Sequence, residues 1–453
     1  MSSVLHRTLE WTPPTAVAGE GNYLIDHTGK RYLDACGGAA VSCLGHDNAK
    51  VREALKAELD TIAFTHNGFF TNRPSEELAQ FLIDRAPSGT GRGRVMYLGS
   101  GSEAMEAALK LARQYHLERN EPKRSKIIAR APSYHGNTLG ALATGGHAGR
   151  RGPFQPLLMD VSHIEAAYEY RMRREGEAET DFALRMANLL EKEIQRLGAE
   201  TVMAFVAEPV VGASLGTQPA PMGYFKRIRE ICDQYGVLLI LDEVMCGMCR
   251  TGYFYACEAD GVRPDILTIA KGLGAGYQPI GAMLCSANIY QAIEKGSGFF
   301  LHGHTYLGHP VACAAAYAVV TTVLEENLIA RVTAQGLKIK TFLEDRFGNH
   351  PHIGDIRGRG LFLGMEFVAD RSSKTPFPHQ EARHNRFKLA AFEAGLICYP
   401  MGGTVDGKLG DHVLIAPPFI ISDNQIDEID FPVIGSETID LLLVKKYKLM
   451  KFK

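Results

Sequence analysis

Apolar residues form two alternating patterns along the middle of the chain, one periodic and one continuous. Three stretches repeat them every three or four positions, which is typical of amphipathic helices: residues 48–62, 75–86 and 102–120. Short runs rich in Val, Ile, Leu and Met are typical of fully buried strands, and they occupy residues 94–99, 126–130, 202–209, 236–243, 265–270 and 281–286. This alternation predicts an α/β fold in which helices flank both faces of a mainly parallel sheet.

The two ends of the chain follow another pattern. In residues 19–46, turn signals alternate with short apolar runs, which predicts a hairpin followed by an extended strand. After Asn327, helical patterns alternate with the apolar runs "GRGLFLGMEFV" and "HVLIAPPFI". The chain is therefore divided into an N-terminal segment (1–47), a large domain (48–326) and a C-terminal domain (327–453). We expect the two end parts to form one smaller α+β lobe.

The composition of the 453-residue chain favours small-molecule chemistry. Its 49 basic and 51 acidic side chains leave a net charge of −2, so no global field attracts nucleic acid. The stretch 309–326 is rich in alanine and shorter than the ~20 apolar residues of a membrane span, so we expect a buried helix there and no membrane anchor. The first residues lack the pattern of a secretory signal, which favours a cytoplasmic protein.

Two further features are not expected to carry chemistry. Nine scattered cysteines predict buried thiols, and the single CxxC pair, Cys246 and Cys249, has no second pair with which to form a metal site. The last residues, 439–453, contain five lysines. We expect a solvated tail there, with an amphipathic element on a membrane or acidic partner as the alternative.

Polar residues end several of the apolar runs, where ligands gather in α/β sheets. In "VMYLGSGSEAMEAALKLAR" the free amides and positive end of the helix after Gly101 and Ser102 are suited to a phosphate. The alternative is an ordinary helix start that Ser102 caps. The "SYHG" after residues 126–130 offers Tyr134, whose ring either stacks on a planar ligand or packs in the core.

Two charged residues end the most apolar runs. Asp242 and its neighbour Glu243 follow "GVLLIL", and a buried carboxylate needs a partner. That partner is either a structural cation such as Arg250 or the protonated ring nitrogen of a cofactor. Lys271 follows "DILTIA"; it is either a surface charge or a desolvated amine of lowered pKa that forms a Schiff base with an aldehyde. The glycines at 272, 274 and 276 would leave space beside that amine.

A phosphate cradle, a stacking ring, an acid for a ring nitrogen and a Schiff-base amine together describe pyridoxal 5′-phosphate. With these residues in place, the chain resembles the class III aminotransferases, the ω-aminotransferase branch of the pyridoxal-phosphate enzymes of fold type I. The resemblance runs from about residue 19 to residue 429 and includes the 29-residue step from Asp242 to Lys271. Its ordered motifs are "YLDACGGAAVSCLGH", "GSGSEAMEAALKLAR", "SYHGNTLGAL", "AFVAEPVVGA", "LLILDEVMCGMCRTG", "PDILTIAKGLGAGYQPIGA", "HGHTYLGHPVACAAA" and "IRGRGLFLGMEF".

The resemblance implies a role for each matching residue. Lys271 would hold the cofactor and then act as the base that moves the proton, and Asp242 would keep the pyridine nitrogen protonated. Gly101 and Ser102 would bind the phosphate. Tyr134 would stack on one face of the ring and Val244 would contact the other.

Two more residues carry implied roles with open alternatives. Thr305 would reach the phosphate of the neighbouring subunit, which implies a homodimer with shared active sites or a tetramer; alternatively it caps the Ala-rich helix. The histidines around it, at 302, 304 and 309, need not be metal ligands. Glu208 would lie near the substrate side of the cofactor, with a structural ion pair as the alternative.

The sequence departs from the family at the substrate side. Met105 stands where many members have asparagine, and no arginine follows Arg386, although several members bind a substrate carboxylate with an arginine of the C-terminal lobe. Arg150 or Arg151 is the candidate replacement. Ala39 and Ala40 are small where amine-converting relatives often have an aromatic residue, which predicts a roomy pocket.

The predicted function is transfer of an amino group from an amine or ω-amino acid to a small 2-oxo acid, with pyruvate as the expected acceptor. Kinetics would be ping-pong, because the amino group stays on the cofactor between half-reactions. The alternatives are an aminomutase or a racemase of the same fold, and a nucleotide-binding oxidoreductase. The last lacks a GxGxxG motif with its following acid.

Overall fold

A seven-stranded sheet forms the centre of the larger lobe of the computed structural model, which describes residues 3–9, 11–87 and 93–429. In spatial order its strands are β4 (Arg94–Leu98), β12 (Gly281–Cys285), β11 (Ile266–Ile269), β10 (Leu238–Asp242), β7 (Val202–Ala207), β5 (Lys126–Ala131) and β6 (Ser162–Glu165). Only β12 runs against its two neighbours; the other pairs are parallel. The predicted mainly parallel sheet is therefore confirmed, and β6 is the one strand in it that the sequence pattern did not predict.

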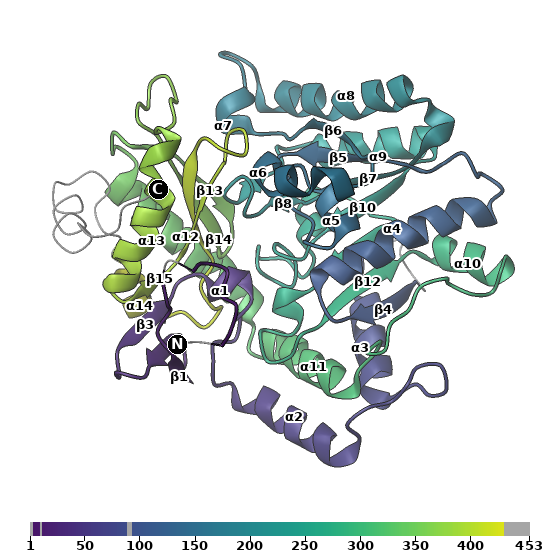
Figure 1. The fold of residues 1–453 in the computed structure, drawn as a ribbon, viewed down its shortest axis with the longest axis horizontal. Helices are drawn as coiled ribbons and strands as arrows, with labels where there is room; N and C mark the ends of the chain where they lie inside the picture. The colour runs from purple at the N-terminus through teal and green to yellow at the C-terminus, as the bar shows by residue number, and fades with distance from the viewer. Residues whose placement is uncertain (1–2, 10, 88–92, 430–453) are drawn as a thin grey trace.

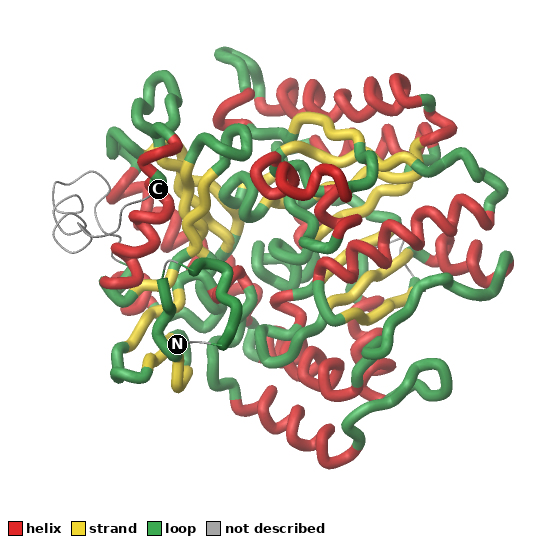
Figure 2. The backbone as a smooth tube through the Cα atoms, in the orientation of Figure 1, coloured by secondary structure: helices red, strands yellow, loops and turns green. Residues whose placement is uncertain are grey.

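Helices cover this sheet on both sides (Figure 2). Those of the larger lobe are α2 (Ala49–Thr61), α3 (Arg73–Asp84), α4 (Gly101–Glu118), α5 (Leu139–Thr144), α6 (Ala148–Arg151), α7 (Glu169–Met172), α8 (Glu179–Leu197), α9 (Tyr224–Tyr235), α10 (Ala287–Lys295) and α11 (Pro310–Glu325). The three predicted amphipathic helices correspond to α2, α3 and α4. A buried alanine-rich face of α4 packs against β11 and β12. Met105 lies on that face and its sulfur accepts a hydrogen bond from the Thr268 hydroxyl at 3.3 Å, so this departure from the family is a packing feature.

The smaller lobe combines both ends of the chain, on the left of Figure 1. One sheet has the order β1 (Ala16–Glu20), β2 (Tyr23–Asp26), β3 (Arg31–Asp34) and β15 (Leu396–Ile397), and β15 pairs in parallel with β3. A second sheet has the order β13 (Ile353–Arg359), β14 (Phe362–Phe367), β17 (Asp411–Ile415) and β16 (Tyr399–Gly402). The lobe also contains α1 (Gly37–Ala40), α12 (Leu328–Phe347), α13 (Arg383–Glu393) and α14 (Asp423–Asp427), and β8 (Val210–Val211) pairs with β9 (Gln218–Pro219) nearby. The predicted fold class is confirmed, whereas the boundaries at 47/48 and 326/327 stay predictions.

A buried ionic network joins the two lobes. Glu366 in β14 is fully buried and pairs with Arg171 of α7 at 2.6 Å and with Arg357 of β13 at 2.9 Å. Breaking a buried pair by removing one partner leaves an uncompensated charge. The network therefore fixes how the small lobe sits beside the large sheet.

The predicted buried helix and buried thiols are both present. Most of α11 lies in the core, and all nine cysteines are buried and free. No single helix within the described ranges is long and apolar enough to cross a membrane; α11 and α12 meet those criteria only as a pair, bent by 70°. The lysine-rich stretch 439–453 lies outside the described residues, so the predicted tail stays a prediction.

Candidate active site

A cavity of about 1050 Å³ opens where the strands of the large sheet end and the small lobe begins. It is lined by all the predicted site residues except Thr305: Gly101, Ser102, Tyr134, Arg150, Glu208, Asp242, Val244 and Lys271. They follow the carboxyl ends of β4, β5, β7, β10 and β11, apart from Arg150 on α6. The sheet therefore brings together residues up to 170 positions apart in sequence, from Gly101 to Lys271.

Lys271 lies two residues beyond β11 in a strained conformation. Its φ is +47°, a left-handed value that costs a non-glycine residue ~1 kcal/mol. Burial lowers the pKa of Lys271 to about 8, although the nearby Asp242 carboxylate opposes the shift. A larger fraction of the amine is therefore neutral at physiological pH than for an exposed lysine, and the neutral form is the nucleophile.

Only one of the three glycines after Lys271 lines the cavity. Gly276 does so, with φ +84°. A Cβ on Gly274 would lie 2.5 Å from the carbonyl oxygen of Gln278, and a Cβ on Gly272 would lie 3.2 Å from Met248. Space at the cavity is therefore seen for Gly276. Gly274 is required by close packing of the turn, and Gly272 is favoured by it, so clearance beside the amine stays a prediction for these two.

Asp242 is the last residue of β10 and its side chain is held by two groups. His135 Nδ1 lies 2.8 Å from Oδ2, and the amide of Val244 donates to Oδ1 at 2.9 Å. A carboxylate only accepts hydrogen bonds, so Nδ1 of His135 carries the proton. Asp242 is 3% exposed, and these contacts fix the orientation of its carboxylate in the cavity that it lines.

Glu243 and Arg250 turn out to be structural residues that do not contact Asp242. Glu243 is fully buried and accepts the amides of Ala256 and Cys257 at 2.6 and 2.8 Å. Burial raises its pKa to about 7. Arg250 donates to two main-chain carbonyls of the C-terminal part of the chain. Arg250 is therefore the wrong structural partner, and the structural contact of Asp242 is His135.

The start of α4 is organised as an anion site. Ser100, and not Ser102, is the N-cap, because its hydroxyl accepts the amide of Glu103 at 3.2 Å. The Ser102 hydroxyl accepts the amide of Asn137 at 3.1 Å. The first amides of a helix have no partner within it, so those of Gly101 and Ser102 are available to a ligand. A Cβ on Gly101 would lie 2.7 Å from the Val244 side chain, so only glycine keeps this approach open.

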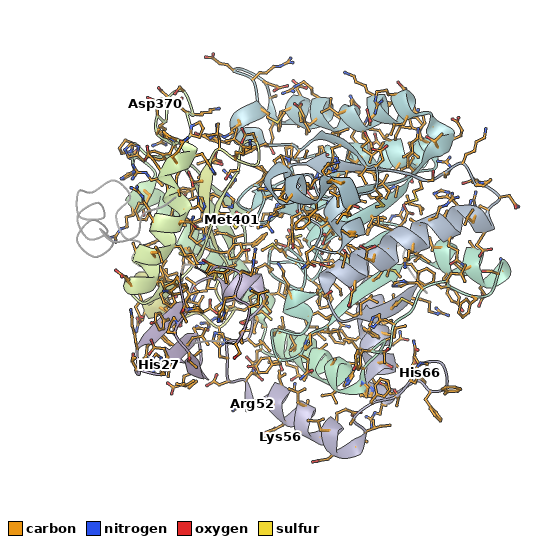
Figure 3. The ribbon with its side chains drawn as sticks, in the orientation of Figure 1. His27, Arg52, Lys56, His66, Asp370 and Met401 are labelled. Atoms are coloured by element: carbon orange, nitrogen blue, oxygen red, sulfur yellow. The ribbon has the colours of Figure 1, made fainter. Side chains whose placement is uncertain are left out.

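Tyr134 and Arg150 form a stacked pair at the cavity. The Arg150 guanidinium carbon lies 4.5 Å from the centroid of the Tyr134 ring, and its Nη2 lies 4.0 Å from Met401 Sδ in β16. Figure 3 shows Met401 between the two lobes. Arg151 points elsewhere, donating to the carbonyl of Gly145 at 3.1 Å. Of the two candidate arginines, Arg150 is therefore the one that faces a ligand.

Glu208 forms the structural ion pair that the sequence offered as an alternative, while its role on the substrate side of the cofactor stays a prediction. It lines the cavity, and its Oε1 accepts the Tyr134 amide at 3.3 Å. Its Oε2 lies 3.7 Å from Arg130 Nη2, so the structural ion pair also exists. Burial raises the pKa of Glu208, while the charges of His135 and Arg130 oppose the shift.

Thr305 is exposed in the loop before α11 and does not line this chain's cavity. The N-cap of α11 is His309, so the alternative that Thr305 caps that helix is wrong. Among the described residues, no group of three or more His, Cys, Asp or Glu side chains is placed to hold a metal ion. The role of Thr305 toward a second subunit stays a prediction.

Some lining residues were not predicted from the sequence. His135 holds Asp242, although its only sequence signal is its place beside Tyr134. Arg7 and Phe154 line the mouth from segments outside the strands. Ala39 lines the cavity as expected, whereas Ala40 is 2% exposed and packs in the core, so the predicted roominess rests on Ala39 alone.

Comparisons with known proteins agree with this arrangement. The family model described as Aminotransferase class-III matches residues 9–430. The chain belongs to this family. An aminotransferase of Gibberella zeae is 44% identical to this class III aminotransferase over 432 residues, which cover 94% of this chain and 84% of that protein. YodT, an uncharacterized aminotransferase of Bacillus subtilis, is 40% identical over 416 residues, which cover 92% of this chain and 93% of that protein.

Solved transaminases share the fold of this class III aminotransferase. The ω-transaminase of Pseudomonas jessenii in complex with PMP has a TM-score of 0.88 at 33% identity, over 94% of each chain. The (S)-enantioselective ω-transaminase of Thermomicrobium roseum also has a TM-score of 0.88, at 34% identity and over 94% of each chain. The chain is thus an aminotransferase of fold type I.

The cavity residues fit pyridoxal 5′-phosphate, on which this family depends. The open helix start suits its phosphate, Tyr134 suits its ring, Asp242 suits its ring nitrogen and Lys271 suits its aldehyde. We call these residues, with Val244, the cofactor half of the cavity. We use the name substrate half for five of the other lining residues, which come from outside the large sheet: Arg7, Ala39, Val41, Phe154 and Tyr399.

Proposed function

We propose that this enzyme binds pyridoxal 5′-phosphate in the cavity and moves an amino group from an amine or ω-amino acid to a small 2-oxo acid, with pyruvate as the acceptor. The observation that carries the proposal is the union of Lys271, Asp242 and the open start of α4 in one cavity. When bound, the cofactor supplies an electron sink for the substrate carbon. The protein's contribution is to orient the groups and to move protons.

Lys271 is the proton carrier in this proposal. With a pKa of about 8, its amine accepts or releases a proton near neutral pH with little driving-force penalty. His135 and the Val244 amide hold Asp242 in place, so its charge would act on the ring nitrogen of a bound cofactor without reorganisation of the protein. The lysine and the aspartate thus divide the work between proton transfer and charge stabilisation.

Arg150 is the proposed partner of the acceptor carboxylate. It has no carboxylate partner among the described residues, and its charge helps to lower the pKa of Lys271, so it lies near the reacting amine. A guanidinium offers two parallel donors to a carboxylate. Arg150 therefore takes the place of the C-terminal-lobe arginine that this sequence lacks.

A homodimer with shared active sites accounts for an exposed apolar surface around Thr305. Large side chains there are more than 40% exposed: Phe64, Phe69, Phe70, Phe299, Leu301 and Tyr306. Phe64 and Tyr306 already stack edge to face, with ring centroids 6.0 Å apart. Clustered exposed aromatics are typical of protein interfaces, and a second copy that covers them would bring Thr305 to the neighbouring cavity. Light scattering distinguishes a dimer from a tetramer or a monomer.

The test of the function uses a donor panel with pyruvate and 2-oxoglutarate as acceptors. We expect the purified enzyme to show a cofactor absorption band and to consume oxo acid in step with donor. Lys271→Ala should lose turnover by ~10³-fold or more, whereas Lys295→Ala, at an exposed lysine of α10, should not. Conversion of a donor without consumption of oxo acid would instead identify an aminomutase or racemase. Absence of the absorption band would contradict the cofactor assignment.

A further inference from the structure

Two arginines of the cavity have no carboxylate partner. The carboxylates that line it are Asp242, held by His135 and the Val244 amide, and Glu208, held by Arg130 and the Tyr134 amide. Arg150 makes only ring and sulfur contacts, and no ion pair or hydrogen bond of Arg7 exists within the described ranges. Three lysine or arginine side chains line the described part of the cavity. Because Lys271 is assigned to the cofactor, Arg7 and Arg150 are the two that are available to bind a substrate carboxylate.

Arg7 lies at the mouth of the cavity. It lines the wall and is at the same time exposed, which places it between the interior and solvent. It is carried by the N-terminal segment before β1, which Figure 1 draws in purple beside the small lobe. Arg150, by contrast, lies on the Tyr134 ring and close enough to Lys271 to lower its pKa. Arg7 is therefore the cation of the cavity in contact with solvent, and Arg150 is the one near the reacting amine.

The substrate half that contains Arg7 is otherwise uncharged. Its other members, Ala39, Val41, Phe154 and Tyr399, line the same cavity and carry no charge. An apolar wall with a single solvent-exposed cation suits a ligand with an apolar chain and a carboxylate at the far end. Because guanidinium–carboxylate contacts are bidentate and directional, such a cation discriminates between donors that carry the carboxylate and donors that lack it.

We propose that Arg7 is a specificity-determining residue that binds the distal carboxylate of the amino donor, so that ω-amino acids are preferred over carboxylate-free amines. This inference rests on the proposed aminotransferase function and narrows its donor class. Arg7 is not a catalytic residue in this proposal, because it contacts the end of the donor that does not react. Removing it should change selectivity and leave the cofactor chemistry intact.

The experiment compares two donors that differ only by the carboxylate, 4-aminobutanoate and 1-butylamine, with pyruvate in excess. In the holoenzyme the ratio of their kcat/KM values should favour 4-aminobutanoate. Arg7→Gln should lower that ratio about tenfold, the loss expected for one partly solvated charge-assisted contact, and Arg7→Lys should recover part of it. The matched control is Arg263→Gln, an exposed arginine before the amino end of β11, on the opposite edge of the sheet from the cavity. It should leave the ratio unchanged.

A binding readout separates Arg7 from turnover. Butanoate has the same chain and carboxylate but no amine, and its calorimetric Kd for the holoenzyme should rise about tenfold in Arg7→Gln. An unchanged donor ratio together with an unchanged butanoate Kd would overturn the proposal. An equal loss for both donors would also overturn it, because it would indicate a damaged wall and not a missing charge. A wild-type protein without a cofactor band would contradict the proposed function. The butanoate Kd of that protein as purified, compared with the Kd of Arg7→Gln, would then still show whether Arg7 binds a carboxylate.

Discussion

The two halves of the cavity are built in different ways. The cofactor half comes from the ends of neighbouring strands of one continuous sheet, so its groups are fixed by main-chain hydrogen bonds and core packing. The substrate half comes from the N-terminal segment, α1 and the residue after it, the short 3-10 helix Gly152–Leu157 that follows α6, and β16. Substitutions in the first half should therefore affect chemistry or cofactor affinity, and those in the second should affect which substrate is used.

The largest contrast is expected between two adjacent residues, Asp242 and Glu243. Asp242→Asn removes the charge opposite the ring nitrogen and should lower kcat by about 10²- to 10³-fold, the usual size for a preorganised electrostatic contact. Glu243→Gln should instead lower the free energy of unfolding by ~1–3 kcal/mol, because it disturbs two buried amide contacts. Steady-state kinetics and chemical denaturation of both variants test this division. Similar kcat values for the two variants would contradict the assignment of an electrostatic role to Asp242 and a structural role to Glu243.

The pKa of Lys271 predicts how cofactor capture depends on pH. Burial lowers that pKa to about 8, and only the neutral amine attacks an aldehyde. Capture of pyridoxal 5′-phosphate by the apoprotein should therefore rise about tenfold per pH unit below 8 and level off above it. In Asp242→Asn the midpoint should move to lower pH, because the carboxylate that favours the charged amine is gone. Stopped-flow absorbance measures both curves, and a midpoint near 10 would show that the amine is solvated.

A smaller effect is expected at the start of α4. Gly101→Ala places a Cβ 2.7 Å from Val244 and crowds the anion site, which should raise the Kd of the cofactor about tenfold. Gly152→Ala is the matched control, because a Cβ there meets nothing within 4 Å. Equilibrium titration of the apoproteins gives both constants. Equal affinities in the two variants would argue that the phosphate lies elsewhere.

The smallest effect is expected in the substrate half. Ala39→Phe fills part of the wall and should lower kcat/KM for a bulky aromatic amine about fivefold, while a small donor such as 1-butylamine changes less than about twofold. The ratio of the kcat/KM values for the two donors is an internal control, because general damage to the enzyme would lower both values equally. Loss of the cofactor band in this variant would show that Ala39 supports the cofactor half, and the comparison between the halves would fail there.

The cofactor half could be predicted from the sequence because each of its groups follows an apolar run. Asp242, Lys271 and Tyr134 all lie at or just after strand ends, and parallel strands bring their carboxyl ends to one edge of a sheet. Arg7 and Phe154 follow no strand, so no local pattern indicates that they reach the cavity. The same limit explains the wrong cap at Ser102 and the wrong partner for Arg250. Both depend on contacts that neither propensity nor spacing specifies.

The antiparallel direction of β12 could not be predicted either, because a five-residue apolar run does not indicate whether its strand is parallel or antiparallel to its neighbours. The structure pairs it with β4 so that Gly281 lies opposite Leu98, and a Cβ on Gly281 would lie 2.4 Å from the carbonyl oxygen of Ser100. The sequence after Lys271 therefore returns to the start of α4 within ten residues.

This return has a consequence for how the enzyme is made. Strand β12 pairs with β4, which precedes the proposed phosphate site, although about 180 residues of chain separate the two strands. Their pairing therefore has a high contact order and cannot form from local structure alone. During synthesis, residues 94–98 must wait until 281–285 have emerged. The nascent chain should thus be unable to retain pyridoxal 5′-phosphate until most of the large domain has been translated. Once the sheet has formed, binding of the cofactor would stabilise the folded protein by mass action.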